Sequence, residues 1–244
     1  MVRKNRRTRR RNYKRKSKRM IRKGGGPADR IDLSQRTPTL PPAEINDLVS
    51  HVIYINLDAR DDRKAHILRE LSIFKPEKIT RMPAVIDKNP KLGCSKSHIK
   101  ALEMARDNKY PNVLIMEDDA MWTNVDVTYP ILKRLLSQPY DGILLGTISG
   151  STFDENTLRV TFGETTSGYI VKEPFYQKYI ELYHNALSKL DPNNNGAFVL
   201  ADGLSNNAYK AGLWYVVHPS LVTQLPSYSN INLQYKNLTP RFYK

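Results

Sequence analysis

The sequence predicts an α/β domain in which a mostly parallel β-sheet is flanked by helices. Short apolar runs rich in β-branched and aromatic residues alternate with segments whose apolar residues recur at helical spacing. Some of the apolar runs are continuous, as expected for strands that are covered on both faces. Alternation of strands and helices is typical of a largely parallel, Rossmann-type sheet.

The predicted strands contain mainly β-branched, aromatic and other apolar residues. They are HVIYINL (51–57), VLIM (113–116), GILLG (142–146), GYIV (168–171) and LWYVV (213–217). A first helix is predicted over 62–74, and a second begins with Ser95 or Ser97 as its N-cap. A third follows the strand at 168–171, with Pro174 in its first turn.

The positive charge of the chain is concentrated near its start. The formal net charge is +15, and residues 1–23 contain 14 Lys and Arg side chains but no Asp or Glu. The remainder has 25 basic and 24 acidic residues and is therefore nearly neutral. Like charges repel and this segment has almost no apolar residues, so it is predicted to be disordered.

Composition divides the chain into three predicted parts. Residues 1–26 form a disordered basic arm that ends in three glycines, and residues 27–47 form a proline-containing linker. Residues 48–244 form the folded domain, which is long enough for one hydrophobic core.

The sequence shows no sign of membrane insertion or of disulfide bonds. No apolar run approaches the ~20 residues of a transmembrane helix, and no signal-peptide apolar region follows the basic start. The single cysteine, Cys94, excludes an intramolecular disulfide. These features lead us to expect a cytoplasmic protein without a transmembrane anchor.

Three adjacent carboxylates, Glu117, Asp118 and Asp119, follow the strand predicted to be most central. Ligands of α/β sheets bind at the carboxyl ends of the strands. Strand alternation predicts that Glu117 and Asp119 point to one side and Asp118 to the other. Mutual repulsion requires a cation or hydrogen-bond donors nearby, and Mg²⁺ and Mn²⁺ prefer carboxylate oxygens. An exposed acidic turn is the alternative interpretation.

Four motifs in this order and spacing resemble glycosyltransferase family 25, the lipooligosaccharide and collagen galactosyl- or glucosyltransferases. They are INLDARDDR (55–63), MPAVID (82–87), GCSKSHIKALEMA (93–105) and LIMEDDA (114–120). The resemblance continues more faintly through TSGYIV (166–171), ADGLSNN (201–207) and VVHPSLVTQ (216–224). Large DNA viruses encode transferases that resemble this family, so a virion-associated location is a second expectation.

The resemblance implies a GT-A-like fold and transfer of a hexose, galactose or glucose, from a UDP-sugar with inversion. The acceptor would be a hydroxyl group of a glycan or a protein, and Mn²⁺ or Mg²⁺ would assist. Glu117 and Asp119 stand where the family's metal-binding motif stands. Asp119 is the first choice as a direct metal ligand, with Glu117 or Asp118 then contacting ribose or water.

Further donor-site candidates follow from the same resemblance. Ser97 and His98 are expected to begin a helix whose N-terminal amides face an anion; for His98 the alternative is a packed, hydrogen-bonded support. An ordinary surface ion pair is the alternative for Arg63. The residues expected to contact the base, ribose or phosphate just after the first strand are Asn56, Asp58, Arg60 and Arg63.

Inversion requires a general base for the acceptor hydroxyl, and Asp202 is the candidate. A helix N-cap is the competing role for Asp202. His218 is a candidate late metal ligand, and a surface histidine is its alternative. Gly203 replaces the family's usual aromatic residue, which makes the acceptor side the least conserved part of the resemblance. Cys94 is expected to pack at a helix start rather than to act as a nucleophile.

The basic arm is expected to bind polyanions such as nucleic acid in a salt-dependent way. Two other functional classes compete with a transferase. One is a non-catalytic nucleic-acid-binding or virion protein built on a decayed transferase domain. The other is a metal-dependent nuclease or phosphotransferase, which would also use clustered carboxylates.

Overall fold

The structure, a computed structural model, describes residues 37–188, 201–231, 234–238 and 241, with the side chains of 201–204 left out. The predicted basic arm and the first part of the predicted linker lie outside the described residues. The rest of the linker contains the short helix α2 (Ile45–Leu48), whose Ile45 is fully buried in the core.

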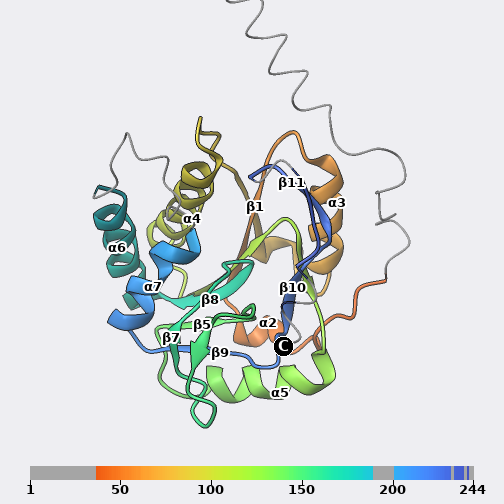
Figure 1. Ribbon diagram of the computed structural model, residues 1–244. Coiled ribbons are helices and arrows are strands. Elements are labelled where there is room, and N and C mark those ends of the chain that lie inside the picture. Colours follow the sequence, from red (N-terminus) through yellow and green to blue (C-terminus); the bar gives the residue numbers. More distant parts are fainter. Residues whose placement is uncertain (1–36, 189–200, 232–233, 239–240, 242–244) are drawn as a thin grey trace, which may run out of the picture.

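A six-stranded sheet forms the centre of the molecule (Figure 1). Its strands in spatial order are β2 (Ile79–Pro83), β1 (His51–Asn56), β3 (Asn112–Glu117), β8 (Gly168–Lys172), β5 (Gly142–Leu144) and β9 (Trp214–Val216). Parallel pairing joins β2 to β1, β1 to β3, and β5 to β9, while β8 runs antiparallel to both of its neighbours. The predicted α/β class with a mostly parallel sheet is therefore confirmed.

The five predicted strands are all present, but β2 was not predicted. Its sequence ITRMP has one buried side chain, Met82, because it lies at the edge of the sheet. Every residue of β1 is buried, which agrees with its continuous apolar run. The direction of β8 was also not predicted, since a continuous apolar run carries no information about strand orientation.

Helices pack on the sheet from different sides (Figure 1). Helix α3 (Asp61–Glu70) contacts β1, and α4 (Pro90–Asp107) contacts β1, β2 and β3 as well as the helices α6 and α7. The remaining long helices are α5 (Val125–Leu136), α6 (Tyr176–Ser188) and α7 (Ala201–Ala211). None of the helices in the described part of the chain has the length and apolarity needed to span a membrane.

Helix α4 begins five residues before the first of its two predicted start points. Pro90 occupies its first turn, and the side chain of Asn89 accepts a hydrogen bond from the amide of Lys91 as an N-cap. Ser95 and Ser97 are instead buried within the helix. The expectation that Ser97 and His98 lie at a helix N-terminus is therefore wrong.

Three short antiparallel strand pairs lie outside the six-stranded sheet in the described part of the chain. Strand β10 (Val222–Gln224) pairs with β4 (Ala120–Trp122), which directly follows the acidic turn. The hairpin of β11 (Ser227–Ser229) and β12 (Gln234–Lys236) comes next in sequence. A separate hairpin consists of β6 (Thr152–Phe153) and β7 (Val160–Phe162). The β10 pairing places residues separated by about a hundred positions in sequence beside the carboxylates.

Trp214 lies at the centre of an aromatic cluster and is fully buried. Gly142 is its neighbour in the sheet, and a β-carbon added there would lie 2.5 Å from ring atoms of Trp214. We therefore expect Gly142→Ala to lower the free energy of unfolding by about 1–3 kcal/mol through overpacking, measured by urea denaturation. Trp214→Phe should reduce the clash, so the double variant should lose less stability than the two single changes together. Additive losses would contradict this explanation.

Candidate active site

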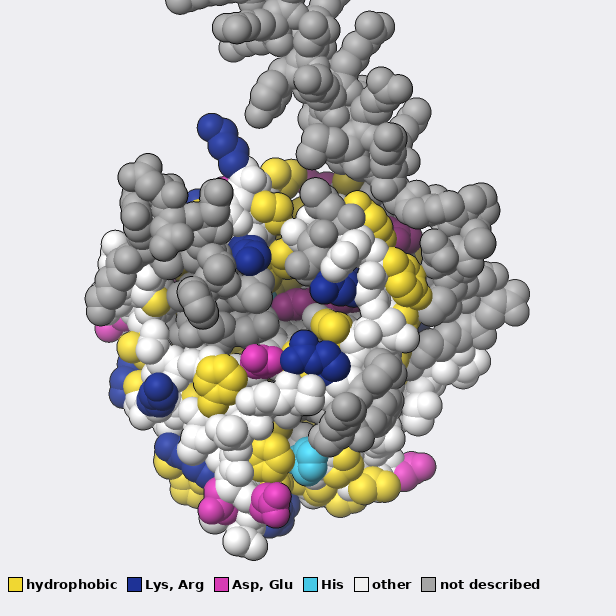
Figure 2. Space-filling view, viewed as in Figure 1, with side chains coloured by type: hydrophobic (Ala, Val, Ile, Leu, Met, Phe, Trp, Pro, Cys, Tyr) yellow, Lys and Arg dark blue, Asp and Glu magenta, His cyan; other side chains and the backbone are white. Residues whose placement is uncertain are grey.

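The three carboxylates lie at the carboxyl end of β3, where β1 also ends. Glu117 is the last residue of β3 and is paired with Ile55 of β1, while Asp118 and Asp119 form the turn into β4. Figure 2 shows acidic side chains in a hollow on this face of the molecule, flanked by basic side chains. The cluster thus lies at the sheet edge where α/β proteins bind ligands.

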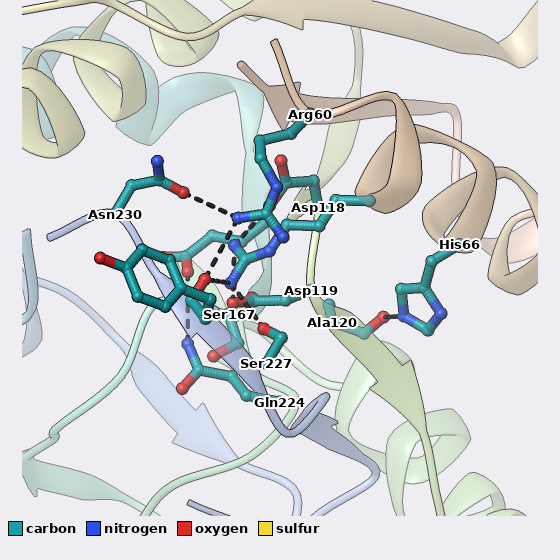
Figure 3. A network of polar contacts seen from close by, with 12 residues as sticks. Arg60, His66, Asp118, Asp119, Ala120, Ser167, Gln224, Ser227 and Asn230 are labelled. Atoms are coloured by element: carbon teal, nitrogen blue, oxygen red, sulfur yellow. Dashed lines mark hydrogen bonds and ion pairs between the residues drawn. The ribbon is translucent and has the colours of Figure 1, made fainter. Parts of the chain in front are cut away.

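Arg63, on α3, forms ion pairs with two of the three carboxylates, Asp118 and Asp119, which Figure 3 shows close to each other. Its Nη1 atom lies 2.9 Å from Asp118 Oδ1 and 2.9 Å from Asp119 Oδ2. The side chains of Arg63, Asp118 and Asp119 are 12%, 9% and 12% exposed. A nearly buried guanidinium shared by two carboxylates excludes the alternative of an ordinary surface pair for Arg63.

The predicted alternation of the three carboxylates is wrong. Asp118 and Asp119 both contact Arg63, whereas Glu117 contacts His98 and Thr166. Alternation holds only within a strand, and β3 ends at Glu117. The turn that follows directs the next two side chains toward α3.

Asn56 and Arg60 complete the α3 side of the site. Asn56 Nδ2 donates to Asp118 Oδ2 at 2.9 Å and to the carbonyl of Arg60 at 3.2 Å. Arg60 Nη1 donates to Asn230 Oδ1 at 2.7 Å, and its Nε and Nη2 atoms bind the carboxylate of Asp62. Asn56 and Arg63 therefore both contact Asp118, and the charge of Arg60 acts on Asp119. Their predicted contacts with the base, ribose or phosphate of a donor stay a prediction.

The C-terminal segment closes the site from the other side. Arg63 Nη2 donates to Ser227 Oγ at 2.7 Å and to the carbonyl of Tyr228 at 3.2 Å. The amide of Leu225 donates to the carbonyl of Asp119 at 2.7 Å. The sequence analysis did not identify this segment as part of the site, because nothing local in its sequence indicates a contact with residues so distant along the chain.

A second set of contacts surrounds Glu117. Its Oε1 atom lies 3.0 Å from Thr166 Oγ1 and 3.3 Å from His98 Nε2, and Gln224 Nε2 donates to Oε2 at 3.3 Å. His98 is fully buried and forms a 2.9 Å hydrogen bond from its Nδ1 atom to the hydroxyl of Tyr169. His98 therefore reaches the site as a buried, hydrogen-bonded side chain.

Burial and charge act differently on the ionisable groups. Burial raises the pKa of Asp119 to about 7, despite the opposing charge of Arg63. Burial also acts to raise the pKa of Glu117, but the hydrogen bonds of His98 and Thr166 and the charges of His98 and Arg63 together outweigh it, and the net shift is downward. Burial acts to lower the pKa of Arg63, but the charges of Asp119 and Asp118 raise it, and the net shift is upward. Asp119 is the acid whose charge is least compensated.

One carboxylate oxygen of Asp119 is left without a hydrogen bond within the described part of the chain. Its Oδ1 atom is buried and has no hydrogen-bond donor among the described residues, while Oδ2 faces Arg63. An uncompensated buried carboxylate oxygen is costly, and divalent cations of the Mg²⁺ and Mn²⁺ kind bind such oxygens. Asp119 therefore fits the metal-ligand role that the sequence predicts for it.

His218 does not join these carboxylates in a metal-binding arrangement. Its ring packs against Phe153, with ring centroids 4.9 Å apart. Within the described residues, Cys94, His98 and Glu117 each place one possible metal-ligand atom within 4.8 Å of the other two. Neither His218 nor Asp119 belongs to this group. The structure thus separates His218 from the site in which the sequence analysis placed it.

Three other predicted residues have different surroundings. Asp58 forms an ion pair with Arg81, and its side chain is 77% exposed. The Ser97 hydroxyl donates to the carbonyl of Gly93 and accepts from the amide of Val85, so it links α4 to the preceding loop. Asp202 lies in the first turn of α7, and its side chain is outside the described residues.

No family model matches the chain, and no curated protein matches its sequence. Solved structures that it resembles include a glycosyltransferase involved in glycosylation of the major capsid of PBCV-1, at 12% identity and TM-score 0.47, covering 71% of this chain and 92% of that one. A nucleoside-diphosphate-sugar pyrophosphorylase from Vibrio cholerae is 14% identical with TM-score 0.44, covering 75% and 80%. At these values the likeness assigns the chain to neither protein.

Proposed function

We propose that this chain is a glycosyltransferase of the GT-A type that transfers galactose or glucose from a UDP-sugar to a glycan or protein hydroxyl. The observation that carries the proposal is the buried, unpaired Oδ1 atom of Asp119 at the carboxyl end of a central strand. The resemblance of the four motifs to glycosyltransferase family 25 supplies the substrate class. The two arginines beside the carboxylates suit a donor that carries a diphosphate.

A divalent cation, Mn²⁺ or Mg²⁺, would bind to Asp119, with Glu117 as a further ligand. When bound, such an ion supplies Lewis-acid stabilisation of the negative charge that develops on the departing diphosphate. Asp118 would not share this role, because both of its carboxylate oxygens are already hydrogen-bonded, to Arg63 and Asn56.

The arginines would orient the donor. Arg60 has a side chain only 14% exposed, and its Nη1 atom donates to the carbonyl of Tyr228 and to Asn230. The acceptors in the C-terminal segment, a backbone carbonyl and an amide oxygen, are uncharged. Phosphate oxygens are charged and therefore accept stronger hydrogen bonds from arginine. A donor diphosphate would therefore compete with Tyr228 and Asn230 for the hydrogen bonds of Arg60. It would compete in the same way with Ser227 for the hydrogen bond of Arg63.

Asp202 remains our proposal for the general base. Inversion at the anomeric carbon requires a group that removes the acceptor proton. Its place in the first turn of α7 equally suits a residue that stabilises the helix N-terminus. Asp202→Asn distinguishes these roles, because loss of the general base should remove most of the transfer activity, whereas loss of a charge near the helix N-terminus should lower stability by only about 0.3–1 kcal/mol.

A thermal-shift screen of nucleotide sugars with Mn²⁺ tests the proposed function. A UDP-hexose at 100 times its Kd should stabilise the protein by about 2.7 kcal/mol, which corresponds to a rise in Tm of roughly 5–10 °C for a domain of this size. EDTA should remove the effect, and ADP- and GDP-hexoses are the matched controls. Absence of stabilisation by any nucleotide sugar would favour the non-catalytic alternative.

The basic arm would act separately from the site. We expect its 14 positive side chains to retain the protein on heparin at moderate salt, because binding to polyanions releases counterions. Deletion of residues 1–23 should abolish this retention while leaving the UDP-sugar response unchanged. Equal retention with and without the arm would show that polyanion binding lies elsewhere.

A further inference from the structure

A thiol, an imidazole and a carboxylate converge beside the carboxylate hollow. One possible metal-ligand atom from each of Cys94, His98 and Glu117 lies within 4.8 Å of the other two. His98 is fully buried, and Cys94 and Glu117 are partly buried. This combination differs in kind from the aspartate pair, where all possible ligand atoms are oxygens.

The fold brings the three side chains together from two elements. Cys94 and His98 are four residues apart on α4, so they lie on the same face of the helix. Glu117 ends β3, the strand against which α4 packs. Both elements are rigid, which favours a defined ligand geometry.

The distance between the imidazole and the carboxylate also allows both groups to bind one ion. His98 Nε2 and Glu117 Oε1 are 3.3 Å apart, whereas a charge-assisted hydrogen bond is about 2.7–2.9 Å long. Two ligands of a tetrahedral Zn²⁺ at about 2.0–2.1 Å from the ion lie roughly 3.3 Å from each other. The His98 nitrogen and the Glu117 oxygen are thus as far apart as two ligand atoms of one zinc ion would be.

Surrounding hydrogen bonds fix the imidazole in the orientation that a ligand needs. His98 Nδ1 lies 2.9 Å from the hydroxyl of Tyr169, a fully buried residue of β8. On metal binding, Nε2 would give up the proton that it shares with Glu117, and Nδ1–H would donate to the Tyr169 hydroxyl, so that the Nε2 lone pair is free for the ion. Histidine ligands of metals are commonly held in this way by a second hydrogen bond. Thr166 similarly donates to Glu117 Oε1 at 3.0 Å.

We propose that Cys94, His98 and Glu117 bind Zn²⁺ as a three-ligand site that leaves one coordination position for water or another oxygen ligand. Thiolate and imidazole select Zn²⁺ over Mn²⁺ and Mg²⁺, so this site and Asp119 would take different metals. Binding would release the thiol proton of Cys94. The inference goes beyond the proposed function and does not depend on it, although Glu117 belongs to both sites.

Cobalt spectroscopy of the metal-free, full-length protein tests the site directly. Co²⁺ replaces Zn²⁺ and reports its ligands, and the chain has one cysteine, so a sulfur-to-cobalt charge-transfer band can arise only from Cys94. We expect the charge-transfer band and intense tetrahedral visible bands to reach saturation with one Co²⁺ at Cys94, separate from any Co²⁺ that binds at Asp119, and both sets of bands to be lost on addition of Zn²⁺. Cys94→Ser should remove the charge-transfer band. Tyr169→Phe should weaken Co²⁺ binding by roughly 10–100-fold.

Asp119→Asn is the matched control, because it removes the ligand proposed for the donor site and should leave the cobalt spectrum unchanged. Loss of UDP-sugar binding in this variant with an intact spectrum would separate the two sites. Wild-type protein, folded by circular dichroism, that shows no charge-transfer band at saturating Co²⁺ would overturn the proposal, and so would a band that persists in Cys94→Ser.

Discussion

Asp119→Asn is expected to lower the rate of sugar transfer by roughly 10²–10³-fold, the loss seen when one preorganised electrostatic stabiliser is removed from an active site. Asparagine keeps the size of the side chain but offers a cation a single neutral oxygen. The carboxylate with the unpaired, buried Oδ1 atom is thereby lost, while Asp118 keeps its contacts with Arg63 and Asn56. The measurement is release of UDP from UDP-galactose and UDP-glucose in Mn²⁺.

Asp107→Asn is the control for this change. Asp107 ends α4 with a side chain 63% exposed and pairs with Arg106 on the surface. The Asp107→Asn variant should transfer sugar at the wild-type rate. Stability should not explain the loss in Asp119→Asn, because burial raises the pKa of Asp119 to about 7 and a neutral side chain is thus tolerated. Transfer by Asp119→Asn within a few-fold of wild type would exclude Asp119 as the metal ligand.

Arg63→Met should produce the largest loss of stability, about 3–5 kcal/mol at pH 7, because removing one member of a buried ionic cluster leaves uncompensated charge. Arg63 is the cation that contacts both Asp118 and Asp119, and methionine fills similar space without charge. Urea denaturation measures the effect. Adding Asp118→Asn and Asp119→Asn to Arg63→Met should restore most of the lost stability, since the two aspartate charges that Arg63 contacts would then be absent as well.

The cost of Arg63→Met should depend on pH. Without Arg63 the pKa of Asp119 in the folded state rises further above its unfolded value. The folded state then holds a proton that the unfolded state releases, so stability falls as pH rises above about 4. Because the pKa of Asp119 is already about 7 in the wild type, the two proteins should lose stability in parallel between pH 4 and pH 7, and the cost of Arg63→Met should grow as the pH rises from 7 to 9. Arg106→Met, which removes an exposed pair, should cost less than about 1 kcal/mol at either pH. An equal cost for both variants would contradict a buried ionic cluster.

The sequence was sufficient to predict five of the six strands of the sheet and the carboxylates at its edge. Continuous apolar runs such as VLIM (113–116) have to be covered on both faces, and acidic residues directly after such a run can only lie at the strand end. Asn56 ends the neighbouring parallel strand and Arg63 follows it, so the same rule brought both side chains to Asp118.

Predictions that depended on local detail were less accurate. Two serines offered plausible caps for α4, but Asn89 and Pro90 together form the stronger start signal, since one caps and the other suits the first turn. The orientation of Asp119 depended on where β3 ends, and strand ends are poorly defined by sequence.

Contacts between distant parts of the chain could not be predicted. Ser227 and Asn230 reach the arginines because β10 pairs with β4, and no local pattern specifies that pairing. His98 was predicted in the site, but its link to Tyr169 and Glu117 depends on the packing of α4 against β3 and β8. The convergence with Cys94 became visible only in three dimensions.

Calorimetric titration of UDP into the full-length protein tests the central claim most directly, because it measures donor binding without requiring the acceptor. UDP should bind in Mn²⁺, and both EDTA and Asp119→Asn should abolish the heat of binding while Asp107→Asn leaves it unchanged. Binding of UDP with equal affinity in EDTA or by Asp119→Asn would contradict a metal-assisted donor site at the end of β3.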